Sequence, residues 1–202
     1  MLNEKLFDRV DEVYTNQLDG LNDEDRRLTE ITYKSFARNG AKLSTIDKDK
    51  LRTIDSELSV LSPKFANNVL AATNDFELLL TEDQLGGLPE MFKDSAKAAA
   101  KEKGKDDFWL VSLQMPSMFP FMKYSTERSL RKELFLAFTG RCNGGKYANN
   151  DLIVKIVDLS HKRAQLLGYD NYADYVLENR MAEKQEKVFD LLDNLYDASY
   201  DK

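Results

Sequence analysis

Histidine and cysteine are almost absent from this sequence, since each occurs once, as His161 and Cys142. Zinc hydrolase sites commonly use two or three imidazoles, which one histidine cannot supply. A lone cysteine excludes an internal disulfide bond and every metal or iron–sulfur site built from several cysteines. A Gly-x-Ser-x-Gly nucleophile motif is also absent. The residues by themselves therefore indicate no complete catalytic or metal site.

The sequence also lacks a basic tract and a long apolar run. Its formal net charge is −6 and its pI is near 5.0, so it has no cationic surface of the kind that supplies most nonspecific affinity for nucleic acid. The first residues lack the apolar core of a signal peptide, and the longest uncharged run, 108–122, is too short to span a bilayer and contains two prolines. These features predict a cytoplasmic protein that binds neither nucleic acid nor membrane. If the chain is part of a longer protein, a periplasmic location for that protein stays open.

What the sequence does have is a helical period through most of its length. Apolar residues recur every three or four positions, which is typical of amphipathic helices. We expect the helices to cover about 6–18, 22–39, 44–70, 89–104, 125–138, 150–167, 171–179 and 183 to near the end. On the second of these, Leu28, Ile31, Thr32 and Phe36 should line the inner face. The last should carry a stripe of Val188, Leu191, Leu192 and Leu195.

Several helix ends can be predicted from single residues. Asn22 can cap the second helix, Asn39-Gly40 is a left-handed stop signal, and Pro89 suits a first helical position. Pro63 lies inside the 44–70 run and should kink or split it, because proline removes a hydrogen-bond donor and clashes with the preceding turn.

Alternation with a period of two occurs in only two short segments, 76–80 and 108–113. Both are rich in aromatic or branched residues and are bounded by turn residues, so we expect them to pair as a ribbon packed on helices. No long polar linker and no internal repeat is visible. The sequence therefore predicts a mainly α fold, with one short β ribbon, in a single helical domain over 1–202.

The stretch from Gly140 to Tyr147 fits the spacing of a phosphate-binding loop, G-x-x-x-x-G-K. In such a loop the backbone amides cradle phosphates and the lysine neutralises their charge. However, Tyr147 replaces the serine or threonine that would hold magnesium, and the preceding segment has a helical rather than a strand period. We therefore interpret the stretch as a glycine-containing loop between helices.

Two further candidates for chemistry have simple structural explanations. His161 lacks the glutamate and second histidine of a zincin helix, so we expect a surface or partly packed histidine. The carboxylate groups at 23–25, 82–83 and 106–107 sit at expected helix starts or loops, where capping and solvation account for them.

The methionine- and aromatic-rich segment Met115–Tyr124, which contains two prolines, has two interpretations. It could form an adaptable peptide-contacting surface, or it could be a rigid connector that inserts apolar side chains into the helical core.

Ordered phrases along the whole chain are more informative than any single motif. They are NEKLFDRV (3–10), RLTE (27–30), FARNGAKL (36–43), LRTIDSEL (51–58), FANNVL (65–70), GLP (87–89), LQMPS (113–117), LRKEL (130–134) and LLGYDNYADY (166–175). In their order and spacing, these phrases resemble the non-catalytic, N-terminal region of the thimet-oligopeptidase-like zinc metallopeptidases. The peptidyl-dipeptidase (dipeptidyl carboxypeptidase) branch of bacteria looks closest, with oligopeptidase A next.

The resemblance implies a function that the composition could not suggest. Members of this family are almost entirely helical, with two lobes around a deep channel in which a zinc-bound water cleaves short peptides. Their His-Glu-x-x-His helix would lie downstream of this region, so no catalytic, cofactor-binding or metal-binding residue transfers to it, and His161 is not carried over as a ligand.

The resemblance further implies that the chain is a fragment of a larger two-lobed peptidase and lacks the zinc-binding lobe. We expect it to shape the peptide channel, to be inactive in isolation, and to expose apolar surface where the catalytic lobe would dock, which favours self-association. Zinc would belong to the full-length parent only. The alternative is a stand-alone helical protein-interaction module.

Overall fold

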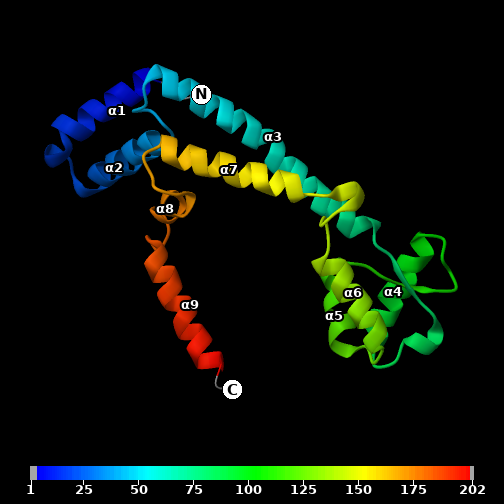
Figure 1. Cartoon of the computed structure of the whole chain (residues 1–202). Coiled ribbons are helices and arrows are strands. Elements are labelled where there is room, and N and C mark those ends of the chain that lie inside the picture. Colours follow the sequence, from blue (N-terminus) through cyan, green and yellow to red (C-terminus); the bar gives the residue numbers. More distant parts are fainter. Residues whose placement is uncertain (1–3, 201–202) are drawn as a thin grey trace. The chain divides into compact units, whose positions relative to one another are not determined.

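A computed structural model describes residues 4–200, and these residues form a predominantly helical structure (Figure 1). The α-helices are α1 (Glu4–Asn16), α2 (Asp23–Arg38), α3 (Thr45–Asp75), α4 (Glu90–Glu102), α5 (Met115–Tyr124), α6 (Arg128–Thr139), α7 (Asn150–Leu166), α8 (Tyr172–Leu177) and α9 (Gln185–Tyr200). The strands are β1 (Leu78–Leu80) and β2 (Trp109–Val111), and short 3₁₀ turns cover Leu18–Gly20, Glu82–Gln84 and Gly145–Tyr147. The mainly α prediction is confirmed.

The chain divides into two compact units. Within the described residues, one unit comprises 4–60 together with 156–200, and the other comprises 61–155. Helices α3 and α7 each contribute residues to both units. The single-domain prediction stays a prediction, since it concerns whether the two units fold together.

Aromatic packing joins α1 and α2 within the first unit. The rings of Tyr14 and Tyr33 stack with centroids 3.8 Å apart, and the buried Phe7 lies against Tyr33 and Phe36. Not all of the expected inner face is covered, because Leu28 and Ile31 are 62% and 50% exposed. That part of the prediction is wrong. Periodicity identifies the residues that share a face, but it does not show how much of the face a neighbouring helix covers.

The expected helix ends are largely present. The Oδ1 atom of Asn22 accepts a hydrogen bond of 2.9 Å from the amide of Asp25, which caps α2 as predicted. Gly40 adopts a positive φ of 87° directly after α2, which glycine tolerates because it has no Cβ. Pro89 differs slightly from the prediction, because it has extended backbone and is the cap residue that precedes α4.

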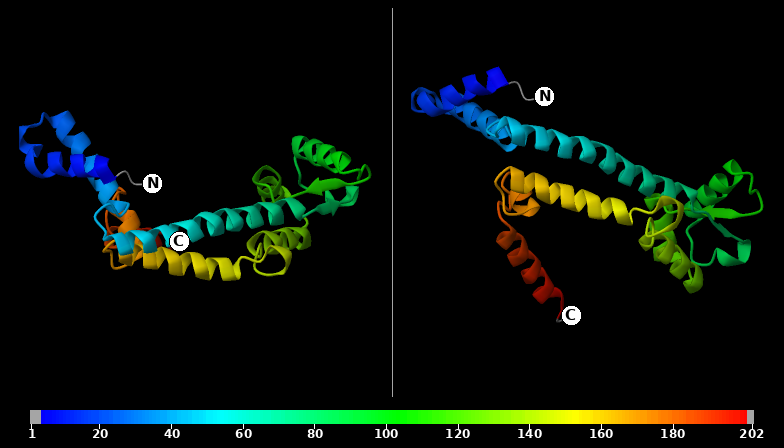
Figure 2. Two further views of the ribbon diagram at one scale, coloured as in Figure 1. Left: turned by 90° about the horizontal axis from the view of Figure 1, so that it is seen from above. Right: turned by 45° about the horizontal axis from the view of Figure 1, so that its top comes forward.

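Pro63 does not split the helix that contains it. Helix α3 continues from Thr45 to Asp75 with Pro63 inside (Figure 2). Pro63 is exposed, so the carbonyl that loses its usual partner can be reached by water. Pro63 also lies three residues beyond the boundary between the two units, which falls after Val60.

The second unit is built on the predicted ribbon. Strands β1 and β2 pair antiparallel, with Leu79 opposite Leu110, although both are shorter than the predicted 76–80 and 108–113. Helices α4, α5 and α6 gather beside this ribbon (Figure 1). The largest fully buried side chains of the unit's hydrophobic core come from both strands and from two of the helices, namely Leu80, Val111, Phe121 and Leu134.

The segment Met115–Tyr124 is a helix rather than a connector. Pro116 lies in its first turn, where a missing N–H costs nothing, and Pro120 lies inside it. Met118 and Phe121 are buried in the core, as the core-insertion interpretation predicts, while Met115 and Phe119 are 48% and 61% exposed.

The last helices differ sharply in burial. On α7, Leu152 and Leu159 are each 9% exposed and therefore buried. On α9, by contrast, no described residue is buried. Its predicted stripe is present in the sequence, but Leu191, Leu192 and Leu195 are all more than half exposed. No helix within 4–200 has the length and apolar character needed to cross a membrane.

Candidate functional site

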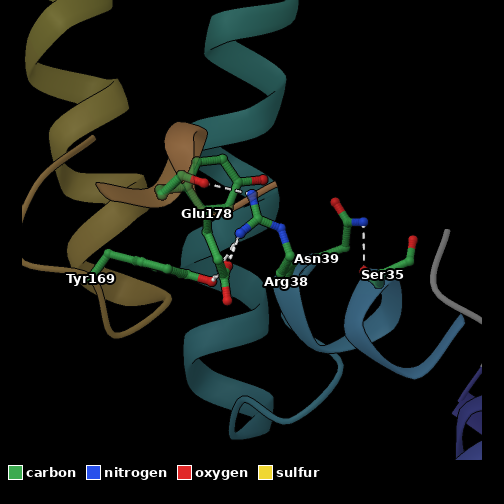
Figure 3. A network of polar contacts seen from close by, with 6 residues as sticks. Ser35, Arg38, Asn39, Tyr169 and Glu178 are labelled. Carbon is green, nitrogen blue, oxygen red and sulfur yellow. Dashed lines mark hydrogen bonds and ion pairs between the residues drawn. The ribbon is translucent and has the colours of Figure 1, made fainter. Parts of the chain in front are cut away.

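The densest polar cluster among the described residues is centred on Arg38, in the last turn of α2 (Figure 3). Its guanidinium donates to the backbone carbonyl of Tyr175 over 2.5 Å and to the hydroxyl of Tyr169 over 3.2 Å, and it forms an ion pair with Glu178. The Tyr169 hydroxyl in turn donates to Glu178 over 2.5 Å. The Arg38 side chain is only 12% exposed, and both of its terminal nitrogens donate to acceptors inside the protein.

A second arginine extends the cluster across the ring of Tyr175. The guanidinium carbons of Arg38 and Arg163 lie 4.5 and 5.0 Å from the centre of that ring, within the range of a cation–π interaction. Arg163 also donates to Asp55 of α3 over 2.7 Å. Burial lowers the pKa of Arg163, but its hydrogen bonds to Asp55 and Tyr175 raise that pKa more, so the net shift is upward.

This arrangement is suited to holding helices together rather than to proton transfer. Every charged group in it faces an opposite charge or a hydrogen-bond acceptor, and a paired guanidinium is neither an acid nor a base at neutral pH. The cluster connects α2 and the first half of α3 to the end of α7 and to α8, all within the first unit. We call these residues, Arg38, Asp55, Arg163, Tyr169, Tyr175 and Glu178, the arginine cluster.

A cavity of about 720 Å³ lies beside the cluster in the same unit. Its lining is amphipathic, with Phe36 and Leu51 beside charged and hydroxyl side chains. The charges are largely satisfied internally, since Lys48 donates to Glu4 over 2.9 Å and this hydrogen bond lowers the pKa of the Glu4 carboxyl. The size would admit a small ligand, but no lining group is oriented by the described structure for a chemical step.

The structure also locates His161 and the carboxylate groups for which we expected a structural rather than a chemical role. His161 is exposed on α7, as its structural interpretation predicts. Within residues 4–200, no three His, Cys, Asp or Glu side chains come together in a way that could hold a metal ion. The carboxylates 23–25 form the first turn of α2, 82–83 lie in a 3₁₀ turn, and 106–107 lie in the loop before β2.

The glycine-containing stretch from Gly140 to Tyr147 is a loop between two helices, in agreement with that interpretation. It follows α6, whereas a phosphate-binding loop follows a strand. Its lysine points to a carboxylate of its own unit, with Lys146 Nζ 3.5 Å from Asp75, and the Tyr147 hydroxyl donates to the same carboxylate. Both interactions connect the loop to Asp75 at the end of α3, and Lys146 is therefore paired with a carboxylate of the protein.

Sequence reasoning missed the arginine cluster because its members lie far apart. Arg38 and Glu178 are separated by 140 residues, and neither belongs to a compact motif. A signal was nevertheless present, since Arg38 lies in the phrase 36–43 and both tyrosines lie in the phrase 166–175. The phrases that carry the family resemblance therefore contain Arg38, Asp55, Tyr169 and Tyr175, but not Arg163 or Glu178.

Comparison with known proteins bears out the resemblance. Residues 121–202 match the sequence model of peptidase family M3. The chain is 36% identical over 183 residues to the probable cytosolic oligopeptidase A of Arabidopsis thaliana, an alignment that covers 87% of this chain and 26% of that protein. It is 34% identical to oligopeptidase A of Escherichia coli, with 87% of this chain and 26% of that protein covered.

The dipeptidyl carboxypeptidase of Escherichia coli is 32% identical over 203 residues, covering 98% of this chain and 30% of that protein. Identity is thus higher to the oligopeptidases, while the alignment to the dipeptidyl carboxypeptidase reaches further along the chain. The chain spans between a quarter and a third of the length of these curated relatives.

Proposed function

Because this chain is related to the peptidases of family M3, we propose that it is the N-terminal, helical, non-catalytic part of a zinc-dependent oligopeptidase or peptidyl-dipeptidase. In that parent enzyme it would form one wall of the channel that receives short peptides. The zinc ion and the residues that activate water would come from the remainder of the parent, which is the partner we propose for this chain. We place the parent in the cytoplasm.

The observation that carries this proposal is the extent of the match. Nearly the whole chain aligns with a dipeptidyl carboxypeptidase, yet the aligned part makes up only 30% of that protein. The names of these relatives describe peptidases, and the described residues of this chain bring no metal-ligand set together. These residues do not fit a zinc ion, so we assign no catalytic step to any of them.

The arginine cluster supports a structural role for the chain in such a wall. A wall must keep its shape while peptides enter and leave, and buried, fully paired polar groups fix the relative positions of the helices that carry them. In the first unit, Arg38 and Arg163 fix α8 against α2 and α3. Their contribution is therefore to position helices, not to react.

The proposal is tested first on the purified chain. It should not hydrolyse a fluorogenic peptide with a free C-terminus when zinc is added, while the dipeptidyl carboxypeptidase of Escherichia coli, assayed alongside, should. Zinc-dependent hydrolysis by the 202-residue chain that a chelator removes would overturn the proposal that the catalytic groups lie elsewhere.

The second test is the DNA beyond the codon for Lys202. We expect the reading frame to continue into a His-Glu-x-x-His segment. A natural stop codon at this point would instead support a stand-alone helical interaction module, a role for which the exposed apolar side chains of α9 would be suited.

A further inference from the structure

Helix α9 carries far more apolar surface than a helix needs to pack on one neighbour. At 100° per residue, its large apolar side chains and its small residues Ala198 and Ser199 fill an arc of roughly 200°, whereas a surface helix usually has a stripe about 100° wide. Six of the large apolar side chains, Phe189, Leu191, Leu192, Leu195, Tyr196 and Tyr200, are each between 51% and 73% exposed.

The arc has two sides of different chemistry. Leu191 and Leu195 lie on one side, while Phe189, Tyr196 and Tyr200 lie on the other, with the rings of Tyr196 and Tyr200 5.1 Å apart. One flat neighbour cannot cover an arc of this width, because the two sides face in different directions. A helix with this pattern is suited to the interior of a larger structure, where it is contacted from two sides.

We propose that α9 is an internal helix of the complete M3 peptidase, covered on both its leucine side and its aromatic side by the part of that polypeptide that lies outside this chain. This inference rests on the proposed function and names the surface at which the two parts of the enzyme meet. Helix α9 lies within the stretch 121–202 that matches the family, and more than two-thirds of the dipeptidyl carboxypeptidase of Escherichia coli lies outside the aligned region.

Charge favours this occupant over a second copy of the chain. The remaining arc of α9 carries Glu186, Asp190, Asp193 and Asp197 but only one cation, Lys187, which is paired with Glu183 at 2.5 Å. Among the described residues, none of the three aspartates has an ion-pair partner within 4.0 Å. Two copies packed through α9 would bring these acidic edges together, which is unfavourable. A different surface that carries lysine or arginine at its rim would complement them.

Three consecutive residues provide a matched test. Asn194, Leu195 and Tyr196 follow one another and therefore face three directions, namely the polar arc, the leucine side and the aromatic side. All three are exposed in this chain. We would introduce Asn194→Cys, Leu195→Cys and Tyr196→Cys singly into a Cys142→Ser background, which leaves one thiol in the 202-residue chain. Alkylation by N-ethylmaleimide would be measured at the introduced cysteine, by mass spectrometry of the peptide that contains it. Each variant would be made both in the 202-residue chain and in the product of the complete reading frame.

In the 202-residue chain, all three thiols should react at similar rates. In the complete product, alkylation at 195 and at 196 should slow by about tenfold or more, while 194 should change little, because burial protects a side chain in proportion to the cost of exposing it. Circular dichroism of each variant checks that the helices are retained. If Leu195→Cys fails to fold, Ala198→Cys replaces it on the leucine side, and if Tyr196→Cys fails to fold, Tyr200→Cys replaces it on the aromatic side.

Three results would overturn the inference. The first is equal, fast alkylation at all positions in the complete product, and the second is protection of only one side. The third is protection of 195 and 196 already in the 202-residue chain, which would point to a second copy if it increases with concentration and to another part of this chain if it does not. Failure of the proposed function can be distinguished from failure of this inference about α9. If the proposed function is wrong, the reading frame does not continue into a peptidase segment.

Discussion

Replacing Arg38 by methionine should lower the stability of the first unit more than any other single change in the arginine cluster. Methionine keeps much of the apolar stem but removes the charge and all of the donors. The carbonyl of Tyr175 and the hydroxyl of Tyr169 then lose a charged donor, and Glu178 loses its ion-pair partner.

The magnitude follows from the burial of each partner. A hydrogen bond from a charged group to a partly buried acceptor is worth about 1.5–3 kcal/mol. Loss of the ion pair adds little, because Glu178 is 48% exposed and exposed pairs contribute about 0–1 kcal/mol. Loss of the stacking on Tyr175 removes a further ~0.5–1 kcal/mol. We therefore expect Arg38→Met to lower the free energy of unfolding by about 2–4 kcal/mol, since such terms are not fully additive.

The matched control is Arg27→Met, made on the same helix. Arg27 is 68% exposed and lies 3.5 Å from Glu30, so its replacement should cost less than about 0.5 kcal/mol. Urea unfolding followed by far-ultraviolet circular dichroism measures both. Equal losses for Arg27→Met and Arg38→Met would refute the conclusion that the arginine cluster stabilises the packing of α2 on α8.

The same unfolding series tests the single-domain prediction. The only tryptophan, Trp109, lies in the second unit, so its fluorescence reports on a part of the chain that does not contain Arg38. If the chain folds as one domain, Arg38→Met should shift the fluorescence transition as far as the circular dichroism transition. An unchanged fluorescence midpoint would show that the two units unfold separately.

Two further changes in the second unit should follow from its geometry. Gly87 has a φ of 78°, and a Cβ there would lie 2.2 Å from the backbone oxygen of Tyr124, so Gly87→Ala should cost about 3 kcal/mol in urea unfolding. Gly104→Ala, at a similar φ but with open space, should cost only about 1 kcal/mol, and equal costs would contradict the clash. The hydrogen bond from Tyr147 lowers the pKa of Asp75 below 3.8. Its contribution to stability is therefore complete at neutral pH and is lost as pH falls through the lowered pKa. Asp75→Asn should then lower the melting temperature at neutral pH, and this difference should shrink as the pH falls below 3.8 and the carboxylate becomes protonated. A difference that stays constant as the pH falls below 3.8 would contradict the assignment.

Features determined by a few neighbouring residues were predictable from the sequence. The Asn22 cap, the left-handed Gly40 and the antiparallel ribbon all depend on local hydrogen bonding or a local period, and the structure has each of them. The helical character of Met115–Tyr124 was not predictable in the same way, because Pro120 lies inside the segment and disfavours a helix interior. Burial of Met118 and Phe121 in the core compensates for that cost.

The arginine cluster depends on contacts between distant parts of the chain. No period or spacing links Arg38 to Glu178 or Arg163 to Asp55, because these pairs exist only after α2, α3, α7 and α8 have packed together. A single sequence shows that arginines, tyrosines and acids are present but not which of them meet. The order of the family phrases was the available signal, and it pointed to the family rather than to the contacts.

Exposed apolar residues carry different information depending on whether they are isolated or contiguous. Leu28 and Ile31 are exposed on α2, but Arg27, Glu30 and Lys34 are interspersed with them, and scattered exposed apolar residues are ordinary on protein surfaces. On α9, the apolar arc covers about half of the circumference, with only Gln185 and Ser199 as polar residues within it, and the acidic residues are confined to the other half. Solubility alone would favour interspersed charges on both halves. The separation on α9 is therefore explained by a surface that other protein covers, which is the reason we assign the docking role to this helix and not to α2.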